Sequence, residues 1–307
     1  MRVFVTGATG HIGTAVVRDL LGEGHVVVGL ARSDRSAAAL TAAGAEAHRG
    51  DLADLDGLRS AAVAADGVVH LAYQHDFSDM QAAARLDLGT IETIGAALDG
   101  SGKPFVVTSG TLPLAMAAPG RAGTEEDVFG PQFAAVPRVT AENTAIALAD
   151  RGVRSSVVRL APAVHSTADQ HGFLTRLIGI ARDKGVSAFV GDGTNRWPGV
   201  HTLDAARLFR LAVESAPAGS RLHGAADAGV PFRDIADVIG RHLNLPVVAI
   251  SRAEAETHFG FLAAIAALDN PTSSTSTRKQ LGWNPEHPGL LADLDEGHYF
   301  STAKASA

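Results

Sequence analysis

Three glycines near the N-terminus have the spacing of a phosphate-binding turn. Gly7, Gly10 and Gly13 follow an apolar run at residues 3–6 and lead into a helical pattern. In this context the first glycine allows a sharp turn, the second lets a pyrophosphate approach the backbone, and the third allows close helix packing. The N–H groups and the positive dipole end of the helix favour an anion. We expect a dinucleotide to contact Gly7, Thr9, Gly10, His11, Ile12 and Gly13; the alternatives are a turn without a ligand and a solvent-facing His11.

The residues after the second apolar run indicate which dinucleotide is bound. An acidic residue at such a strand end binds the ribose hydroxyls of NAD, whereas a basic residue favours the 2′-phosphate of NADP. Arg32 stands at this strand end with Ser33 and Arg35 behind it, and Asp34 is the competing acidic residue. Because guanidinium groups match phosphate geometry, we predict NADP(H), with NAD as the alternative. A merely solvated loop is the other interpretation of these arginines.

Further cofactor contacts are expected where other strands end, because ligands bind at the carboxyl ends of strands in open α/β sheets. Asp51 and Leu52 follow the third strand, where adenine is usually contacted. The remaining expected contacts lie at the ends of the fourth, fifth and sixth strands and are Leu71, Ala72, Thr108, Pro162 and Val164.

Side chains at the same strand ends could exchange a proton with a substrate. Tyr73 follows the fourth strand, and His75 lies on the same loop as a partner for it. His165, after the sixth strand, is a second candidate proton donor. Tyrosine and histidine both act as general acids when a substrate oxygen is within reach. The alternatives are an aromatic wall for Tyr73 and a solvated side chain for His75.

These residues require a sheet whose strands end along one edge. Continuous apolar runs, typical of strands buried on both faces, occur at residues 3–6, 26–30, 68–72, 105–108 and 156–160, with a shorter run at 45–48. Helical patterns separate them at 12–21, 55–65, 80–98 and 140–150. This alternation predicts an α/β protein with a Rossmann fold, a doubly wound parallel sheet.

The alternation ends after residue 162. Helices are predicted at 173–184, 203–215 and 232–243, and a loop-rich tail from Asn270 contains a Ser- and Thr-rich loop at 272–277. We predict an NADP-binding Rossmann domain at residues 1–162 and a smaller, mainly substrate-binding domain at 163–307. A return of residues 200–215 to the first domain is left open.

Composition excludes several classes of protein and site. The net charge of −7 without a basic run argues against nucleic acid as a partner. The absence of cysteine excludes disulfides and thiolate ligands. The 13 histidines are scattered, without metal-binding spacing, and no GxSxG occurs, so we expect neither a metal site nor a serine hydrolase. No apolar run is long enough to span a membrane, and we expect a cytoplasmic protein.

Five motifs in this order resemble those of the extended and atypical short-chain dehydrogenase/reductases, which include epimerases and dehydratases of the NAD-dependent type. They are the glycine turn, GDL at 50–52, VHLA at 69–72, VVTS at 106–109 and VHTLDAA at 200–206. The resemblance covers nearly the whole chain. It implies a nicotinamide cofactor and a small-molecule substrate, but it does not specify that substrate.

In that family a tyrosine and a lysine in a YxxxK pattern handle the proton. This pattern is absent here, since neither Tyr73 nor Tyr299 is followed by a lysine four residues later. Alignment on Glu142 puts Ala134 at the tyrosine position and Arg138 at the lysine position. The resemblance therefore implies that Arg138 is a fixed cation near the cofactor ribose, although arginine is a poor proton relay.

The other family positions are partly kept. The asparagine position holds Asp87, and a hydroxyl is supplied by Ser109 or Thr111. Our candidate catalytic residues are thus Ser109, Thr111, Tyr73, His165, Asp87 and Arg138.

Residues 195–201 correspond to a segment that lines the substrate pocket in relatives. Arg196 could bind an anionic group and Trp197 could stack on a flat one. His75 and His201 complete the candidate substrate residues. A surface ion pair, a core position, and a buried hydrogen bond between His201 and Asp204 are the respective structural alternatives for Arg196, Trp197 and His201.

We interpret the chain as an atypical short-chain NADP(H)-dependent oxidoreductase that transfers hydride to or from a small carbonyl-type substrate. Two alternatives are left open. One is an NADP(H)-binding regulator or sensor without turnover, and the other is a nucleotide-sugar epimerase or dehydratase. Because relatives dimerise through helices corresponding to 80–98 and 140–150, a homodimer is a further expectation.

Overall fold

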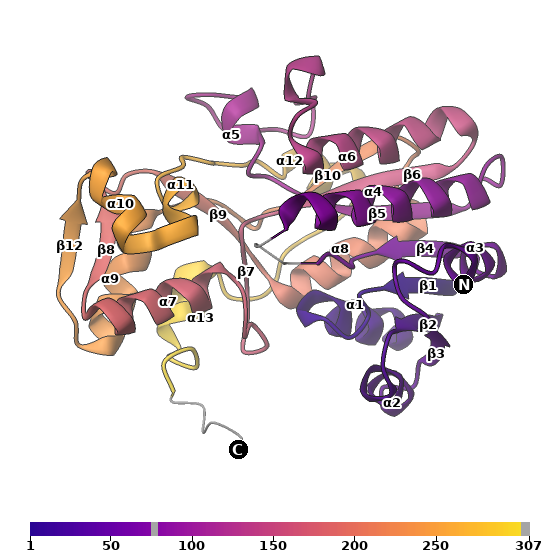
Figure 1. Ribbon diagram of the computed structural model, residues 1–307, viewed down its shortest axis with the longest axis horizontal. Coiled ribbons are helices and arrows are strands. Elements are labelled where there is room, and N and C mark those ends of the chain that lie inside the picture. The colour runs from indigo at the N-terminus through magenta and orange to yellow at the C-terminus, as the bar shows by residue number, and fades with distance from the viewer. Residues whose placement is uncertain (75–78, 302–307) are drawn as a thin grey trace.

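A computed structural model describes residues 1–74 and 79–301. Its centre is a sheet of seven strands in which every neighbouring pair is parallel (Figure 1). From one edge to the other the order is β10 (Ser220–Gly224), β6 (Arg154–Leu160), β5 (Pro104–Gly110), β4 (Gly67–His70), β1 (Arg2–Thr6), β2 (Val26–Ala31) and β3 (Glu46–Arg49). The predicted doubly wound Rossmann sheet is confirmed.

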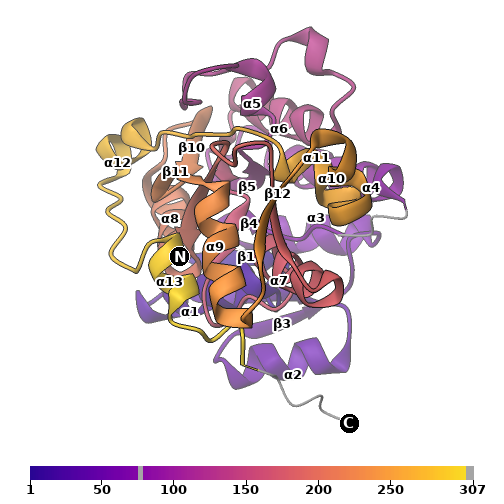
Figure 2. The same cartoon turned by 90° about the vertical axis from the view of Figure 1, so that its left-hand side faces the viewer.

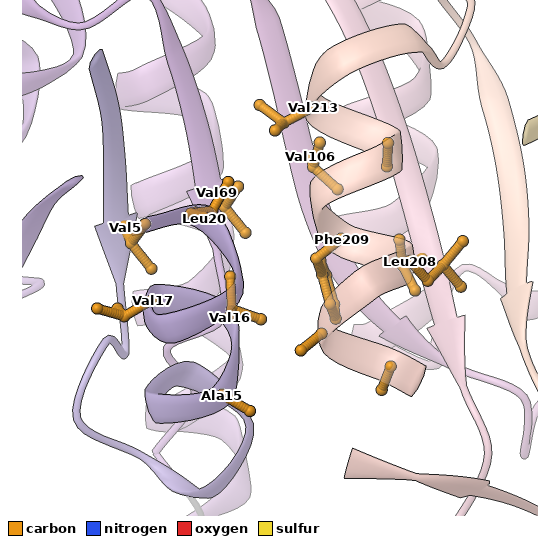
Figure 3. Close-up of a cluster of buried hydrophobic side chains, with 14 of the residues drawn as sticks. Val5, Ala15, Val16, Val17, Leu20, Val69, Val106, Leu208, Phe209 and Val213 are labelled. Atoms are coloured by element: carbon orange, nitrogen blue, oxygen red, sulfur yellow. The ribbon is translucent and has the colours of Figure 1, made fainter. Parts of the chain in front are cut away.

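Helices cover both faces of this sheet. One face carries α1 (His11–Gly22) and α8 (Thr202–Ser215), and the other carries α3 (Leu55–Ala64), α4 (Met80–Ala97) and α6 (Pro137–Ala147). Figure 3 shows α1 and α8 directing Leu20 and Phe209 toward Val69 and Val106 of the strands. Each such buried side chain contributes roughly 1.5–3 kcal/mol of hydrophobic stabilisation. The continuous apolar strands are thus explained by burial on both faces.

The rest of the chain forms a second body with its own core. A three-stranded sheet, β11 (Asp227–Pro231), β9 (Arg196–His201) and β7 (Ala163–His165), stands beside a parallel pair, β8 (Ser187–Val190) and β12 (Val247–Ile250). The helices here are α7 (Phe173–Lys184), α9 (Phe232–Leu243), α10 (Arg252–Phe259), α11 (Ala263–Ala266) and α13 (Leu290–Asp295). Figure 2 shows this part from its outer side, with α9 in front. The predicted bounds of α7 and α9 are confirmed.

The chain crosses back to the large sheet after β9. Helix α8 joins the core beside α1, and β10 becomes the edge strand next to β6. Later, α12 (Thr275–Leu281) lies close to β10, and Trp283 enters the same core as α8. The structure thus distributes residues after 162 between both cores. Our division at 162/163 remains a prediction.

Some helices differ from the predicted elements. Residues 34–42 form α2 (Asp34–Ala42), which the apolar pattern did not indicate because Leu40 alone of this helix is buried. The predicted loop at 272–277 is wrong at its end, since α12 begins at Thr275. Helix α6 begins earlier than predicted, because Pro137 occupies a first-turn position where its missing N–H costs nothing. No helix within the described residues is long and apolar enough to cross a membrane.

Candidate cofactor and active site

The glycine turn between β1 and α1 has a geometry that only small residues allow. Gly7 has φ of +68°, and a Cβ there would lie 2.7 Å from the backbone nitrogen of Ala72. A Cβ on Gly13 would lie 1.9 Å from the Gly7 oxygen, so the helix packs on the turn itself. Gly10 is the exposed N-cap of α1, whose first turn contains no acidic residue. The N–H groups of this helix start therefore have the surroundings that an anion requires.

Other predicted residues of the turn lie in different surroundings. Thr9 is exposed and Ile12 is half-buried against the core. The His11 Nε2 atom lies 2.7 Å from the Thr202 hydroxyl oxygen, at the start of α8. A solvent-facing His11 is therefore wrong, because this hydrogen bond joins the glycine turn to the second half of the chain.

The corner between β2 and α2 is basic and exposed. Arg32 and Arg35 are exposed, whereas the Ser33 hydroxyl accepts from the Ser36 N–H in a capping box that starts α2. Asp34, the competing acidic residue, forms an ion pair with Arg49 at the end of β3 (2.6 Å). Arg49 was missed because its proximity to this corner arises from the β2–β3 pairing, which aligns it with Ala31.

The remaining expected cofactor residues lie along the strand ends. Asp51 is exposed and its carboxylate accepts from the Ala53 N–H, while Leu52 is half-buried. The others are all half-buried, and they are Leu71, Ala72, Thr108, Pro162 and Val164. Their partial exposure suits contact with a ligand without requiring one.

Tyr73 and Arg138 meet beside the ends of β4 and β5. The Arg138 guanidinium carbon lies 4.5 Å from the centre of the Tyr73 ring, a cation–π distance. Arg138 also donates to the Thr108 carbonyl and to the Asp87 carboxylate, each at 3.0 Å. Burial raises the pKa of Tyr73, the charge of Arg138 opposes this rise, and the charge of Asp87 adds to it.

A buried chain of hydrogen bonds continues behind this pair. His70, at the end of β4, places Nε2 3.1 Å from Asp87 Oδ1 and Nδ1 2.6 Å from the Thr6 hydroxyl. The Thr6 hydroxyl in turn accepts from the Ala72 N–H. His70 and Thr6 were not among the predicted site residues. These hydrogen bonds connect β1, which precedes the glycine turn, with the Arg138 guanidinium beside Tyr73.

Comparison with known proteins identifies the family. The model of the NAD dependent epimerase/dehydratase family matches residues 3–223, more than half of the chain.

The chain belongs to the NAD-dependent epimerase/dehydratase family. The predicted membership of the extended and atypical short-chain dehydrogenase/reductases is thereby confirmed, and membership supports an enzyme.

Two similar proteins come from yeasts. The uncharacterized protein C2A9.02 of Schizosaccharomyces pombe is 48% identical over 301 residues, covering 98% of this chain and 100% of that protein. The uncharacterized protein YLL056C of Saccharomyces cerevisiae is 43% identical, covering 96% and 98%. A third relative, 26% identical over 85% of this chain and 80% of its own, is a 4-hydroxy-2-methyl-3-oxo-4-farnesyl-3,4-dihydroquinoline-1-oxide ketoreductase of Stigmatella aurantiaca.

Solved structures share the fold at low identity. A double mutant of DesIV, a dTDP-glucose 4,6-dehydratase from Streptomyces venezuelae with NAD bound, superposes with a TM-score of 0.77 at 20% identity, covering 98% of both chains. MoeE5 in complex with UDP-glucose and NAD superposes with a TM-score of 0.73 at 22% identity, covering 96% of each chain. These likenesses support the fold.

The family's hydroxyl position points into the protein interior in this member. The Ser109 hydroxyl is buried and donates to Glu142 (2.9 Å), and the buried Thr111 hydroxyl accepts from the Asn270 side chain (3.0 Å). Both hydroxyls thus already have protein partners. Their expected role at a substrate oxygen finds no support in this arrangement, because Glu142 and Asn270 engage them.

His165 and His201 form a buried histidine cluster. The fully buried His165 bonds to the Asp293 carboxylate (3.0 Å), and its ring lies edge-on to His201. The His201 ring stacks on His287, and burial lowers its pKa to about 4. The predicted His201–Asp204 hydrogen bond is wrong: the His201 Nδ1 caps α8 by accepting from Leu203, and Asp204 pairs with His287.

The two polar substrate candidates on β9 point to opposite sides of the strand. Arg196 forms a two-pronged ion pair with Asp269 at the surface. Trp197 is fully buried between Phe173 and Phe232, and its indole N–H donates to the Ile265 carbonyl. Arg196 thus forms the surface ion pair, and Trp197 occupies the core position, that were given above as the alternatives to substrate binding. The two side chains differ because successive residues of a strand face opposite sides. His75 lies outside the described residues.

A carboxylate–histidine group lies next to the histidine cluster. Asp293, Glu296 and His298 bring their ligand atoms within 4.8 Å of one another. The expectation that the chain has no metal site remains a prediction.

Proposed function

We propose that this family member is an NADP(H)-dependent oxidoreductase that transfers hydride to or from a small carbonyl-type substrate. The observation that carries the proposal is the pairing of Tyr73 with Arg138 at 4.5 Å beside the strand ends. It supplies a protic group and a fixed cation in a chain that lacks YxxxK.

The turn and the basic corner fit a phosphorylated dinucleotide. A Cβ at Gly7 or Gly13 would collide with backbone atoms, so only glycine fits at these two positions of the turn. Arg32 and Arg35 are exposed at the end of β2, where they could bind the 2′-phosphate of NADP, and Arg49 offsets the charge of Asp34. The basic character of this corner supports NADP(H) over NAD as the cofactor.

When bound, the nicotinamide supplies or accepts the hydride. Tyr73 donates its phenolic proton to the substrate oxygen as the carbonyl carbon gains hydride, and it takes a proton back in the reverse direction. Arg138 stabilises the tyrosinate that remains, because a cation close to a phenolate favours the charged form. It does not itself relay the proton.

A relative supports a carbonyl substrate. The protein of Stigmatella aurantiaca is named a ketoreductase, and its similarity extends over 85% of this chain. Because its identity is only 26%, it supports the reaction class and does not define the substrate.

The test compares purified wild-type protein with Tyr73→Phe. We expect NADPH to bind more tightly than NADH, measured by titration calorimetry. We expect NADPH oxidation with at least one member of a panel of aldehydes and ketones. The Phe variant should bind NADPH unchanged and lose about 100-fold or more in kcat, the contribution typical of a general acid.

Three results would contradict the proposal. Binding of NADPH without oxidation across the panel would favour a sensor. Interconversion of a nucleotide sugar, followed by NMR, would favour the epimerase or dehydratase alternative. Equal kcat in the Phe variant would remove Tyr73 from the chemistry.

A further inference from the structure

Asp87 is the junction of the hydrogen-bonded chain behind Tyr73. It lies on α4 and is 3% exposed. Its Oδ1 accepts from His70 and its Oδ2 accepts from Arg138. With a different partner on each oxygen, the carboxylate cannot rotate without losing a charge-assisted bond.

His70 fixes this orientation from the other side. It is 1% exposed, and both ring nitrogens have partners: Nε2 donates to Asp87, and Nδ1 accepts from the Thr6 hydroxyl. This assignment follows from the hydrogen bonds, since an ionised carboxylate can only accept. His70 is therefore a rigid spacer between β1 and α4.

Arg138 is held at two points and keeps one face toward the tyrosine. Its Nη1 binds Asp87 and its Nη2 binds the Thr108 carbonyl, while the guanidinium covers the Tyr73 ring. Its side chain is 28% exposed, whereas that of Asp87 is 4% exposed. Beyond the effect of burial, which raises the pKa of Tyr73, the charge of Arg138 lowers it and the charge of Asp87 raises it.

We propose that Asp87, locked by His70, is a positioning residue that holds the Arg138 guanidinium against Tyr73 and thereby sets how readily Tyr73 releases and regains a proton. This inference rests on the proposed function, in which Tyr73 is the proton donor. Two opposite charges act on the Tyr73 hydroxyl, that of Arg138 and that of Asp87. The cation favours tyrosinate, and the buried carboxylate behind the cation limits that preference.

The chain offers a direct measurement because it contains only two tyrosines, Tyr73 and Tyr299. In a Tyr299→Phe background, the ultraviolet absorbance of tyrosinate reports Tyr73 alone. Asp87→Asn keeps the side-chain volume but leaves one acceptor oxygen for two donors, so Arg138 loses its anchor and we expect the ionisation midpoint of Tyr73 to rise. A fall of the midpoint would overturn the positioning role, because it would mean that Arg138 stays in place and Asp87 acts only through its charge. Arg138→Gln removes the cation, and we expect the midpoint to rise.

Asp204→Asn is the matched control. Asp204 is also a buried carboxylate bonded to a histidine, His287 at 2.9 Å, but it lies on α8 and not on α4. We expect this variant to leave the Tyr73 midpoint unchanged.

In an Arg138→Gln background, Asp87→Asn should cause no further rise, because the cation that it positions is absent; a general loosening of the fold would shift the midpoint in both backgrounds. If Asp87→Asn does not fold, His70→Gln supplies the test, because it loosens Asp87 without removing its charge, and the Tyr73 midpoint should again rise.

Activity provides the second measurement. We expect Asp87→Asn to lower kcat about 10- to 100-fold, as misplacement of a catalytic group does, with the KM for NADPH within about twofold of wild type. Unchanged midpoints in both variants would overturn the positioning role, whatever the activity. Shifted midpoints in a protein that reduces no carbonyl would support the positioning role and reject the proposed function.

Discussion

Two carboxylate–guanidinium pairs in this protein consist of the same chemical groups but lie in different surroundings. Glu142 and Arg159 are both 0% exposed and lie 2.6 Å apart in the interior. Asp87 is equally deep, but its partner Arg138 is 28% exposed and faces Tyr73. The comparison shows that burial of the arginine, more than the ion pair itself, separates a structural contact from one that can meet a ligand.

The interior pair is bonded to other protein groups on several sides. Glu142 accepts from Ser109, Arg159 and Arg221, and Arg159 also donates to the Asp127 carbonyl and lies 3.2 Å from the His223 Nε2. Such a network joins β5, α6 and β6 firmly. The Ser109 hydroxyl belongs to this network, and its catalytic role stays a prediction.

The largest expected effect comes from breaking the interior pair. Glu142→Gln leaves the buried Arg159 charge without compensation, which should lower the free energy of unfolding by about 3–5 kcal/mol. Urea denaturation followed by circular dichroism measures this loss. A loss below about 1 kcal/mol would mean that the interior network relaxes as easily as a surface pair.

A smaller effect is expected from the half-exposed pair. Arg138→Lys keeps the charge but not the planar fork that spans Asp87 and Thr108. We expect kcat to fall about tenfold while stability changes by less than about 1 kcal/mol. Steady-state kinetics and thermal unfolding of the same preparation test both parts. Destabilisation as large as that of Glu142→Gln would erase the contrast between the pairs.

The third effect is a pH dependence located in the interior network. Burial and the Arg159 charge lower the pKa of His223 to about 4, from a usual value of 6.5. The unfolded chain therefore binds this proton more readily, and stability should fall as the pH drops from about 6.5 to about 4. His223→Gln cannot titrate and should flatten this slope in urea titrations at several pH values. The flattening is partial, because burial also lowers the pKa of His201 to about 4. An unchanged slope would contradict the assignment.

Local patterns were sufficient for much of the fold. The strands of the Rossmann sheet up to β6, and the helices α7 and α9, were predicted because their apolar periodicity directly reflects burial. Helix α2 was not predicted because it has no apolar stripe. Its only signal in the sequence is a local polar one, the capping box of Ser33 and Ser36. Strands β7 to β12 were not predicted, because they are short and their pairing partners lie far away in the sequence.

The candidate site divides in the same way. The glycine turn could be predicted because Gly7, Gly10 and Gly13 act through backbone geometry within seven residues. The partner of Tyr73 could not, since Arg138 lies 65 positions away in the sequence. His165 was predicted to follow a strand and Trp197 to line a substrate pocket, but their burial depends on α13, α9 and the α11 segment.

The sequence by itself determined the parallel sheet, the glycine turn and the missing YxxxK, because periodicity, turn conformation and residue identity are local properties. Only the tertiary structure decided which side chains face one another. It placed Arg138 over Tyr73, locked Asp87 through His70 and enclosed Ser109 with Glu142. The physical reason is that burial and charge pairing depend on distances between segments that the order of residues does not contain.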